Sequence, residues 1–200
     1  MVRGVIFDLD GVIADTERLQ WQAYRRVLAE YGVDVGLEEY RRHWIAGGFG
    51  PDQLRARKAP VYSALLRAGV APCPGALEAL RRLRPTHRLG LATNSARAEV
   101  SFILERLGAA ALLHATIARE DYPSSKPAPD AYLAAAAALG LAPGECAVVE
   151  DTERGLRSAL AAGTRAVALP SDLTFDNDFA GAACRLAHLD ELTAELLASI

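Results

Sequence analysis

Apolar runs and helical repeats divide the chain into two kinds of segment. Residues 5–7 form a short apolar run bounded by turn residues, which is typical of a buried strand. Residues 16–31 then place apolar side chains at helical spacing, and ranges 37–45 and 52–68 predict two more helices. No strand pattern occurs between residues 16 and 70. The first strand is therefore followed by a block of helices.

From residue 73 onward, predicted helices alternate with short apolar strands. Alternation of this kind predicts a parallel sheet with helices on both faces. The sequence thus indicates an α/β fold, with a Rossmann-like core of residues 1–15 and 73–200 and an inserted small α-helical cap of residues 16–72. Ligands of such folds bind beyond the carboxyl ends of the strands, so we expect the cap there. The predicted helices are 75–84, 96–107, 129–139, 153–162 and 188–198, and the strands are 88–92, 112–117, 146–149 and 166–169.

Composition narrows the class of protein without naming a function. The 200 residues are 51% hydrophobic and 24% charged, as in a soluble globular protein. The net charge of −3 and the dispersed basic residues argue against nucleic acid, and no apolar run reaches membrane-spanning length. Cys73, Cys146 and Cys184 are odd in number and form no CxxC pair, and no signal-peptide pattern precedes them. We expect a reduced, cytoplasmic protein, with a monomer as the default.

Asp8 and Asp10, at the end of the first strand, are the first candidates for chemistry. Two carboxylates so close repel each other and lose hydration, unless a divalent cation lies between them or one acts as a nucleophile. The alternative is a plain surface turn, since Asp10 and Gly11 form a common turn dipeptide.

Two later strands also end in polar residues. Thr93, Asn94 and Ser95 follow the strand at 88–92, where the first amides of a helix can bind an anion, or where Ser95 simply caps that helix. Glu150 and Asp151 follow the strand at 146–149 and form a second carboxylate pair. The alternative for this pair is a helix cap with a solvated neighbour.

Lysine is rare in this chain, since only Lys58 and Lys126 occur among 22 basic residues. A lysine retained in an arginine-rich chain suggests a need for a compact ammonium group. Lys126, in the loop at 124–129, is expected to reach a phosphate, although a solvated lysine is the alternative. Together the four carboxylates, one hydroxyl and one lysine at a single sheet edge predict a Mg²⁺ site for phosphoryl chemistry.

These segments resemble a known family. The order DLDGVIADT, ATNS, SSKPAPDAY and VVEDTERGL is similar to the haloacid dehalogenase-like phosphohydrolases. The helical block after the first strand resembles the small-cap subgroup, which contains phosphoglycolate phosphatases, β-phosphoglucomutases and Calvin-cycle-type sugar-phosphate phosphatases. This resemblance covers nearly the whole chain.

The resemblance implies roles for the core residues. Asp8 would be the nucleophile and Asp10 the acid and base, while Thr93, Asn94 and Lys126 would hold the phosphoryl group. These roles imply hydrolysis of a phosphate monoester through an aspartyl-phosphate intermediate.

The resemblance also implies a metal site and a substrate class. Asp8, the Asp10 carbonyl group and Asp151 would bind Mg²⁺, with Glu150 bound directly or through water. The expected substrate is a small phosphorylated metabolite of the sugar-phosphate or phosphoglycolate type. A phosphoryl-transfer mutase and a catalytically silent binding protein are the alternatives; the intact carboxylate cluster opposes the silent protein.

The cap residues bear on specificity. Gln20 stands where the mutases usually have a histidine, which argues against a mutase. Gly48, in the glycine-rich stretch at 47–50, is expected to face the crevice. Arg55 and Lys58 lie three residues apart on one helix face, so they are expected to contact the far end of the substrate. A solvated helix face is the alternative for this pair.

Overall fold

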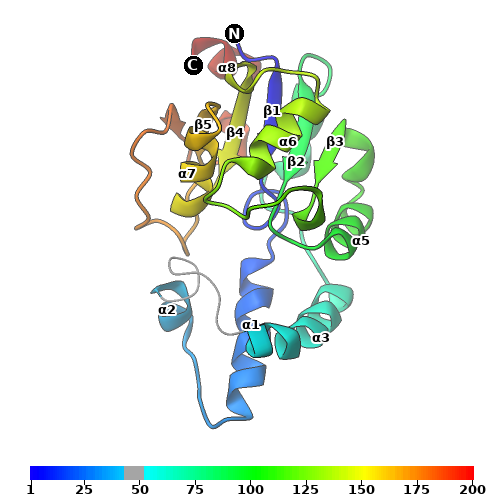
Figure 1. The fold of residues 1–200 in the computed structure, drawn as a ribbon, viewed down its shortest axis with the longest axis vertical. Coiled ribbons are helices and arrows are strands. Elements are labelled where there is room, and N and C mark those ends of the chain that lie inside the picture. Colours follow the sequence, from blue (N-terminus) through cyan, green and yellow to red (C-terminus); the bar gives the residue numbers. More distant parts are fainter. Residues whose placement is uncertain (43–51) are drawn as a thin grey trace.

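The protein is built on a six-stranded parallel sheet (Figure 1) in a computed structural model that describes residues 1–42 and 52–200. The strands lie in the order β3-β2-β1-β4-β5-β6, so the first strand of the chain occupies the centre. The predicted α/β fold with a parallel sheet is confirmed. The strands are β1 (Gly4–Phe7), β2 (Arg88–Ala92), β3 (Ala115–Ile117), β4 (Cys146–Glu150), β5 (Arg165–Ala168) and β6 (Cys184–Arg185).

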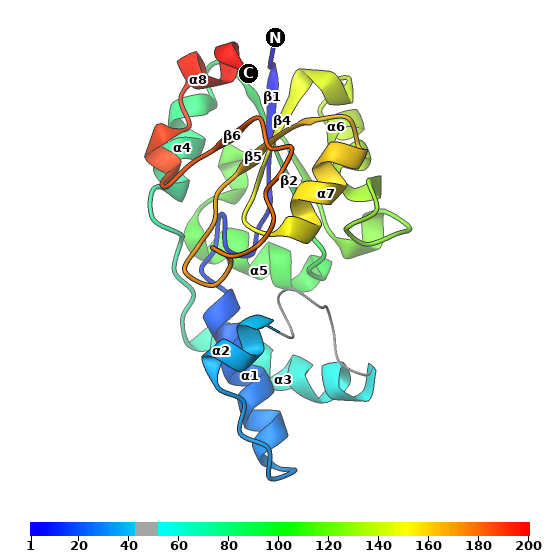
Figure 2. The same ribbon diagram turned by 90° about the vertical axis from the view of Figure 1, so that its left-hand side faces the viewer.

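Helices cover both faces of this sheet (Figure 2). Side chains of β1 alternate between two apolar clusters, because successive residues of a strand point to opposite faces. Val5 and Phe7 belong to one cluster and Ile6 to the other. The first cluster includes buried residues of α4 (Ala76–Leu83), α5 (Arg97–Leu107) and α8 (Ala194–Ser199). The second includes buried residues of α6 (Asp130–Ala138) and α7 (Glu153–Ala161).

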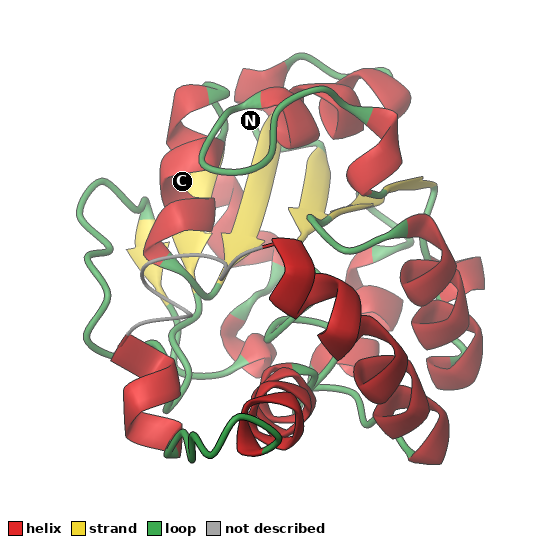
Figure 3. Ribbon diagram, turned by 60° about the horizontal axis from the view of Figure 1, so that its bottom comes forward, coloured by secondary structure: helices red, strands yellow, loops and turns green. Residues whose placement is uncertain are grey.

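Three further helices lie beyond the carboxyl ends of the strands and form the cap (Figure 3). They are α1 (Glu17–Ala29), α2 (Leu37–Tyr40) and α3 (Asp52–Ala68). The two connections between core and cap run side by side, since the Asp15 amide donates to the Ala71 carbonyl at 2.9 Å. The inserted helical cap is therefore present, while its bounds at residues 16 and 72 remain a prediction.

A core loop after β5 holds the cap against the sheet edge. Leu173 from this loop is buried within the apolar cluster of the cap, beside Tyr24 and Tyr40. Arg41 forms an ion pair with Asp176, which adds a charged contact between the same two parts. This loop therefore helps to fix how the cap sits over the carboxyl ends of the strands.

Shortening Leu173 should destabilise the folded protein. We expect Leu173→Ala to lower the free energy of unfolding by about 2–3 kcal/mol, because the side chain is buried and its removal leaves a cavity. Leu133→Ala is the matched control, since Leu133 is 41% exposed on α6 and should change stability by less than about 0.5 kcal/mol. Urea unfolding measures both values. Equal effects of the two variants would contradict the packing role of Leu173.

Some predicted elements differ from the structure. The helix predicted over 188–198 begins late, at Ala194, because Thr193 caps it by accepting from the Leu196 amide at 3.2 Å. The strand β6 escapes the sequence pattern because it has only two residues. The predicted loop at 47–50, with Gly48, lies outside the described residues. Within the described ranges, no helix combines the length and apolarity that crossing a membrane requires.

Candidate active site

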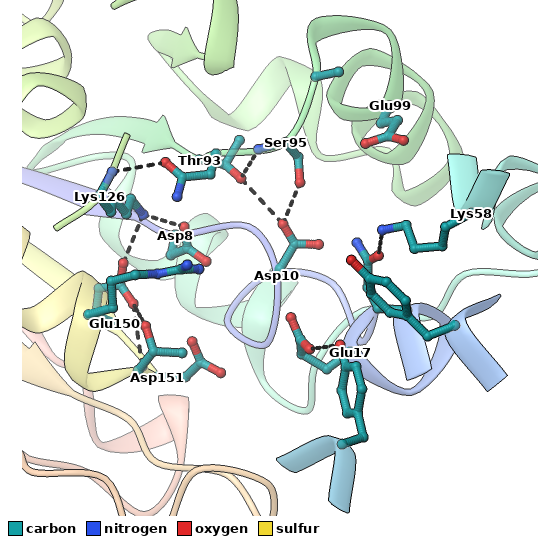
Figure 4. Close-up of a pocket in the computed structure, with 17 residues that line it drawn as sticks. Asp8, Asp10, Glu17, Lys58, Thr93, Ser95, Glu99, Lys126, Glu150 and Asp151 are labelled. Atoms are coloured by element: carbon teal, nitrogen blue, oxygen red, sulfur yellow. Dashed lines mark hydrogen bonds and ion pairs between the residues drawn. The ribbon is translucent and has the colours of Figure 1, made fainter. Parts of the chain in front are cut away.

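The carboxyl ends of the central strands and the cap enclose a cavity of about 190 Å³ (Figure 4). Four segments supply most of its core side: the turns after β1, β2 and β4, and the loop before α6 that carries Lys126. Every core residue predicted for the site lines this cavity, together with two of the predicted cap residues. These residues are Asp8, Asp10, Thr93, Asn94, Lys126, Glu150, Asp151, Gln20 and Lys58.

Lys126 lies at the centre of the core side of the site. Its ammonium group is buried, with 6% of the residue exposed, so the alternative of a solvated lysine is wrong. Nζ donates to Asp8 Oδ1 at 2.5 Å, to the Ala92 carbonyl at 3.0 Å and to Glu150 Oε1 at 2.8 Å. Burial alone would lower the pKa of Lys126, but the two carboxylates raise it above the usual value. The lysine therefore stays charged.

Asp8 follows β1 directly and is buried beside Lys126. Burial raises the pKa of Asp8 to about 7, while the nearby Lys126 charge opposes that rise. The Glu150 and Asp10 carboxylates raise it further. The Lys126 charge alone therefore does not restore the ordinary pKa of Asp8. A cation bound next to this carboxylate would favour its ionised form.

Asp151 supplies the clearest indication of a metal site. Carboxylate oxygens of Asp8, Glu150 and Asp151 all lie within 4.8 Å of one another. Asp151 Oδ1 is buried without a hydrogen-bond partner among the described residues. Burial and the Glu150 charge raise the pKa of Asp151 well above its ordinary value. Because buried carboxylates need compensation and an all-oxygen set suits Mg²⁺, these residues fit the metal that the sequence predicts.

Two glycines make room for these carboxylates. A Cβ atom at Gly11 would lie 2.2 Å from Asp151 Oδ2, and Gly11 also has a φ of +81°. A Cβ atom at Gly155 would lie 1.8 Å from Glu150 Oε1. Neither position can hold a larger side chain without moving a predicted metal ligand. The role of Gly155 was missed, because the sequence does not reveal that α7 packs against Glu150.

Asp10 accepts hydrogen bonds from three hydroxyl groups. Thr16 Oγ1 donates to Oδ1 at 2.5 Å, while Ser95 Oγ at 2.7 Å and Thr93 Oγ1 at 3.3 Å donate to Oδ2. These contacts hold the Asp10 carboxyl group at the wall of the cavity. The roles of Thr16 and Ser95 were missed. Thr16 was only the first residue of the helix predicted at 16–31, and Ser95 was considered only as a helix cap.

The start of α5 corrects one prediction. Ser95 does not cap this helix, because its hydroxyl is bonded to Asp10 and the N-cap position is Ala96. The Glu120 carboxylate takes that place, since it accepts from the Arg97 amide at 2.9 and 3.1 Å. A carboxylate of the chain itself therefore accepts from the Arg97 amide at the start of α5.

Asn94 is held in position by its carbonyl oxygen. Asn94 Oδ1 accepts from Tyr122 Oη at 2.7 Å and from the Lys126 amide at 3.2 Å. Its NH₂ group is then the part that can donate to a ligand oxygen. The Thr93 carbonyl lies 2.8 Å from the same Tyr122 hydroxyl, so the two acceptors share its single proton. No motif in the sequence marked this tyrosine.

The cap side of the cavity is polar. Lys58 Nζ donates to Gln20 Oε1 and lies 4.9 Å from the ring centres of Tyr24 and Tyr62. Arg55 is exposed on α3 and is not among the described residues that line the cavity. The structure therefore brings Gln20 and Lys58 into the site and leaves Arg55 on the surface of the cap.

Glu17 was not predicted as a site residue, although it lines the cavity. Its carboxylate accepts from the Tyr40 hydroxyl at 3.0 Å. Burial, together with the Asp10 charge, raises the pKa of Glu17 to about 7. Glu99 and Arg154 also line the cavity and were likewise missed, because helix spacing alone does not show which exposed turn faces the cap.

The raised pKa values predict that the metal-free protein is less stable at higher pH. The pKa values of Asp8 and Glu17 rise from 3.8 and 4.5 to about 7, so between these limits the folded state binds more protons than the unfolded state. Stability then falls as the pH rises through that window. We expect the melting temperature in EDTA to drop by at least about 3 °C between pH 5.5 and pH 8.

Two comparisons identify the groups responsible. Glu17→Gln should reduce this pH dependence, whereas Asp15→Asn, at an exposed position, should not change it. Adding Mg²⁺ at pH 8 should raise the melting temperature, since a ligand that binds only the folded state stabilises it. A melting temperature that is flat or rising between pH 5.5 and pH 8 in EDTA would contradict this assignment.

Comparison with known proteins identifies the family and agrees with the fold. The model of the haloacid dehalogenase-like hydrolase family matches residues 2–163. Protein CbbY of Rhodobacter capsulatus is 31% identical over 221 residues, covering 98% of this chain and 97% of that protein. Fructose-1-phosphate phosphatase YqaB of Escherichia coli (strain K12) is 30% identical, covering 82% of this chain and 94% of that protein. The chain therefore belongs to the haloacid dehalogenase-like hydrolase family.

Solved structures give the same result. The crystal structure of CbbY from Rhodobacter sphaeroides in complex with phosphate superposes with a TM-score of 0.84 at 27% identity, covering 99% of this chain and 100% of that chain. A variant of that protein was solved with xylulose-(1,5)bisphosphate. Beta-phosphoglucomutase of Bacillus subtilis (strain 168) is also similar, with 29% identity over 98% of this chain and 94% of that protein. The prediction of a phosphatase-type hydrolase is confirmed.

Proposed function

We propose that this protein is a Mg²⁺-dependent phosphatase of a small phosphorylated sugar, acting through an aspartyl-phosphate intermediate. The observation that carries the proposal is the buried contact of 2.5 Å between Lys126 Nζ and Asp8 Oδ1 beside two further carboxylates. A purely structural core would not place three carboxylates together, because their repulsion and lost hydration are unfavourable. A cation and a phosphoryl group make this arrangement favourable.

The residues divide the reaction into two displacements. Asp8 attacks phosphorus, so that a bond forms to its carboxylate oxygen while the ester bond breaks. Asp10, held by hydroxyl groups at the cavity, gives a proton to the leaving alkoxide and then takes a proton from the water that hydrolyses the acyl phosphate. Lys126, Thr93 and Asn94 bind the oxygens of the phosphoryl group.

The metal has a supporting role in this scheme. Asp8, Asp151 and Glu150 would hold Mg²⁺, with the Asp10 carbonyl as a further predicted ligand. Bound there, the cation supplies positive charge against the phosphoryl oxygens, where negative charge develops. Asp151 Oδ1 is its best-supported protein ligand, since that buried atom has no hydrogen-bond partner in the described parts of the chain.

The cap side supports a sugar as the leaving group. Gln20, Glu17 and Lys58 offer amide, carboxylate and ammonium groups to a hydroxylated molecule. Relatives named for phosphorylated sugars also point to this substrate class, since they include the fructose-1-phosphate phosphatase and the CbbY variant solved with a sugar bisphosphate. The phosphoryl site treats all phosphate esters alike, so the choice among them comes from the cap.

Two alternatives remain open to test. The similarity of this chain to beta-phosphoglucomutase favours a mutase. Against it, Gln20 stands where the sequence resemblance expects a histidine in mutases. A silent binding protein would have no use for an unpaired buried oxygen on Asp151. The phosphatase accounts for both residues.

A phosphate-release assay tests the proposal directly. Fructose 1-phosphate, xylulose 1,5-bisphosphate and p-nitrophenyl phosphate are supplied with Mg²⁺ or with EDTA. We expect release from a sugar phosphate with Mg²⁺ and its loss in EDTA. Conversion of β-glucose 1-phosphate to glucose 6-phosphate without phosphate release would indicate the mutase. No turnover of any ester, or full turnover in EDTA, would reject the proposal.

Lys58 should contribute to the choice of substrate. We expect Lys58→Met to raise the KM for the sugar phosphate roughly tenfold, while p-nitrophenyl phosphate turnover stays within about twofold, because the aryl ester has no sugar hydroxyl groups for the cap to bind. Arg55→Ala is the comparison within the same helix. A larger effect at exposed Arg55 would indicate that Arg55 contacts the far end of the substrate. Equal losses with both esters would exclude Lys58 as a specificity residue.

A further inference from the structure

Tyr132 is a buried polar side chain that the proposed mechanism does not yet use. It lies in the first half of α6 and is 0% exposed, among the apolar residues between that helix and the sheet. Its hydroxyl group lies 2.5 Å from Glu150 Oε1 and 2.7 Å from Lys126 Nζ. The ammonium group also sits 4.5 Å from the centre of the Tyr132 ring. This tyrosine therefore contacts the phosphoryl-binding lysine and a predicted metal ligand at once.

The lysine has more acceptors than protons. An ammonium group has three N–H donors. Lys126 Nζ lies within 3.0 Å of four acceptors, namely Asp8 Oδ1, the Ala92 carbonyl, Tyr132 Oη and Glu150 Oε1. Only the tyrosine among them can also donate, and its hydroxyl can bind Glu150 Oε1 while accepting from Lys126. When one N–H of Lys126 donates to a phosphoryl oxygen in place of Glu150, the Tyr132 hydroxyl can still donate to Glu150 Oε1.

Glu150 is fixed on both of its oxygens. Oε1 accepts from Tyr132 and Lys126, and Oε2 accepts from Thr152 Oγ1 at 3.1 Å. The close approach of Gly155 leaves no space for the carboxylate to turn toward α7. Tyr132 thus supplies the hydrogen bond that sets the direction of the Oε1 atom independently of the lysine.

We propose that the Tyr132 hydroxyl is a positioning group for Lys126 and Glu150. It holds the ammonium group against Asp8 and keeps the Glu150 carboxylate in the metal cluster while the lysine engages the phosphoryl group. Packing alone does not explain a tyrosine here, because a phenylalanine would fill the same volume without a hydroxyl to satisfy. The role in turnover rests on the proposed phosphatase function, whereas the role toward the metal cluster can be measured without it.

Tyr132→Phe tests this role, because it removes one oxygen and keeps the ring. We expect kcat to fall roughly 10–100-fold with little change in KM, the range typical of a residue that orients a metal ligand. Without substrate, the Mg²⁺ concentration that gives half of the thermal stabilisation should rise roughly tenfold. Tyr31→Phe is the matched control: Tyr31 is 59% exposed on the cap, contacts Arg57, and should leave both quantities unchanged.

The kcat value and the Mg²⁺ midpoint together distinguish a positioning role of Tyr132 from a purely structural one, and test it independently of the proposed function. An unchanged Mg²⁺ midpoint in Tyr132→Phe, with or without a lower melting temperature, would overturn the proposal. A wild-type protein without phosphatase activity would reject the proposed function, yet a shifted Mg²⁺ midpoint would still support positioning of Glu150. In a Lys126→Met background, Tyr132→Phe should still weaken Mg²⁺ binding, because the tyrosine bonds Glu150 directly; no further change there would count against it.

Discussion

Replacing Asp8 by asparagine should abolish turnover and leave the fold intact. The amide matches the carboxylate in size but cannot attack phosphorus to form an acyl phosphate. We expect kcat to fall by at least roughly 10⁴-fold, the scale seen when a covalent nucleophile is lost. The folded state should survive, because the raised pKa of Asp8 means that a neutral group is favoured there: burial and repulsion by Glu150 and Asp10 outweigh the attraction of Lys126. Phosphate release and the melting temperature measure the two effects.

Asp15→Asn is the matched control for this substitution. Asp15 lies seven residues later, is exposed at the connection to the cap, and does not line the catalytic cavity. Its variant should keep wild-type kcat within about twofold, as expected for a surface exchange. If Asp8→Asn kept more than a few per cent of wild-type activity, and mass spectrometry excluded deamidation, the assignment of Asp8 as the nucleophile would be wrong.

The sheet edge could be predicted from sequence because strand ends are local features. A buried strand must be short and apolar, so the polar residues that follow it mark where it ends. Parallel strands then bring those ends together, which is why Asp8, Thr93 and Glu150 meet although they are far apart in the chain. The arrangement follows from topology, and the three strands that carry these residues were each visible in the sequence.

The groups that hold the site could not be predicted in the same way. Tyr122 and Tyr132 reach Asn94 and Lys126 from a loop and from a helix face. Their positions depend on how α6 packs against the sheet, and a tyrosine in an apolar stretch has no spacing that separates it from ordinary core. Glu120 escaped for a related reason, since it caps α5 from a turn that follows a different strand.

The cap shows the limit most clearly. Helical spacing gave Arg55 and Lys58 a common face, yet Lys58 lines the cavity and Arg55 is exposed. Which part of a helix surface meets a second unit depends on the angle between the two units. That angle is set by contacts such as Leu173 with the cap cluster, which lie more than a hundred residues away in the chain.

Exchanging Lys126 for arginine should remove most of the activity, although the charge is kept. The ammonium group is a point donor with acceptors at 2.5, 2.8 and 3.0 Å on Asp8, Glu150 and the Ala92 carbonyl. A guanidinium group is planar and larger, so it cannot place its donors at one point inside this buried site. We expect kcat/KM to fall roughly 10²–10³-fold, the scale of losing one preorganised donor to a developing oxyanion. Lys58→Arg, at the other lysine of the chain, should change p-nitrophenyl phosphate turnover by less than about twofold, since it lies on the cap side. Near-wild-type kcat/KM in Lys126→Arg, measured with the same ester, would show that this site needs only a positive charge.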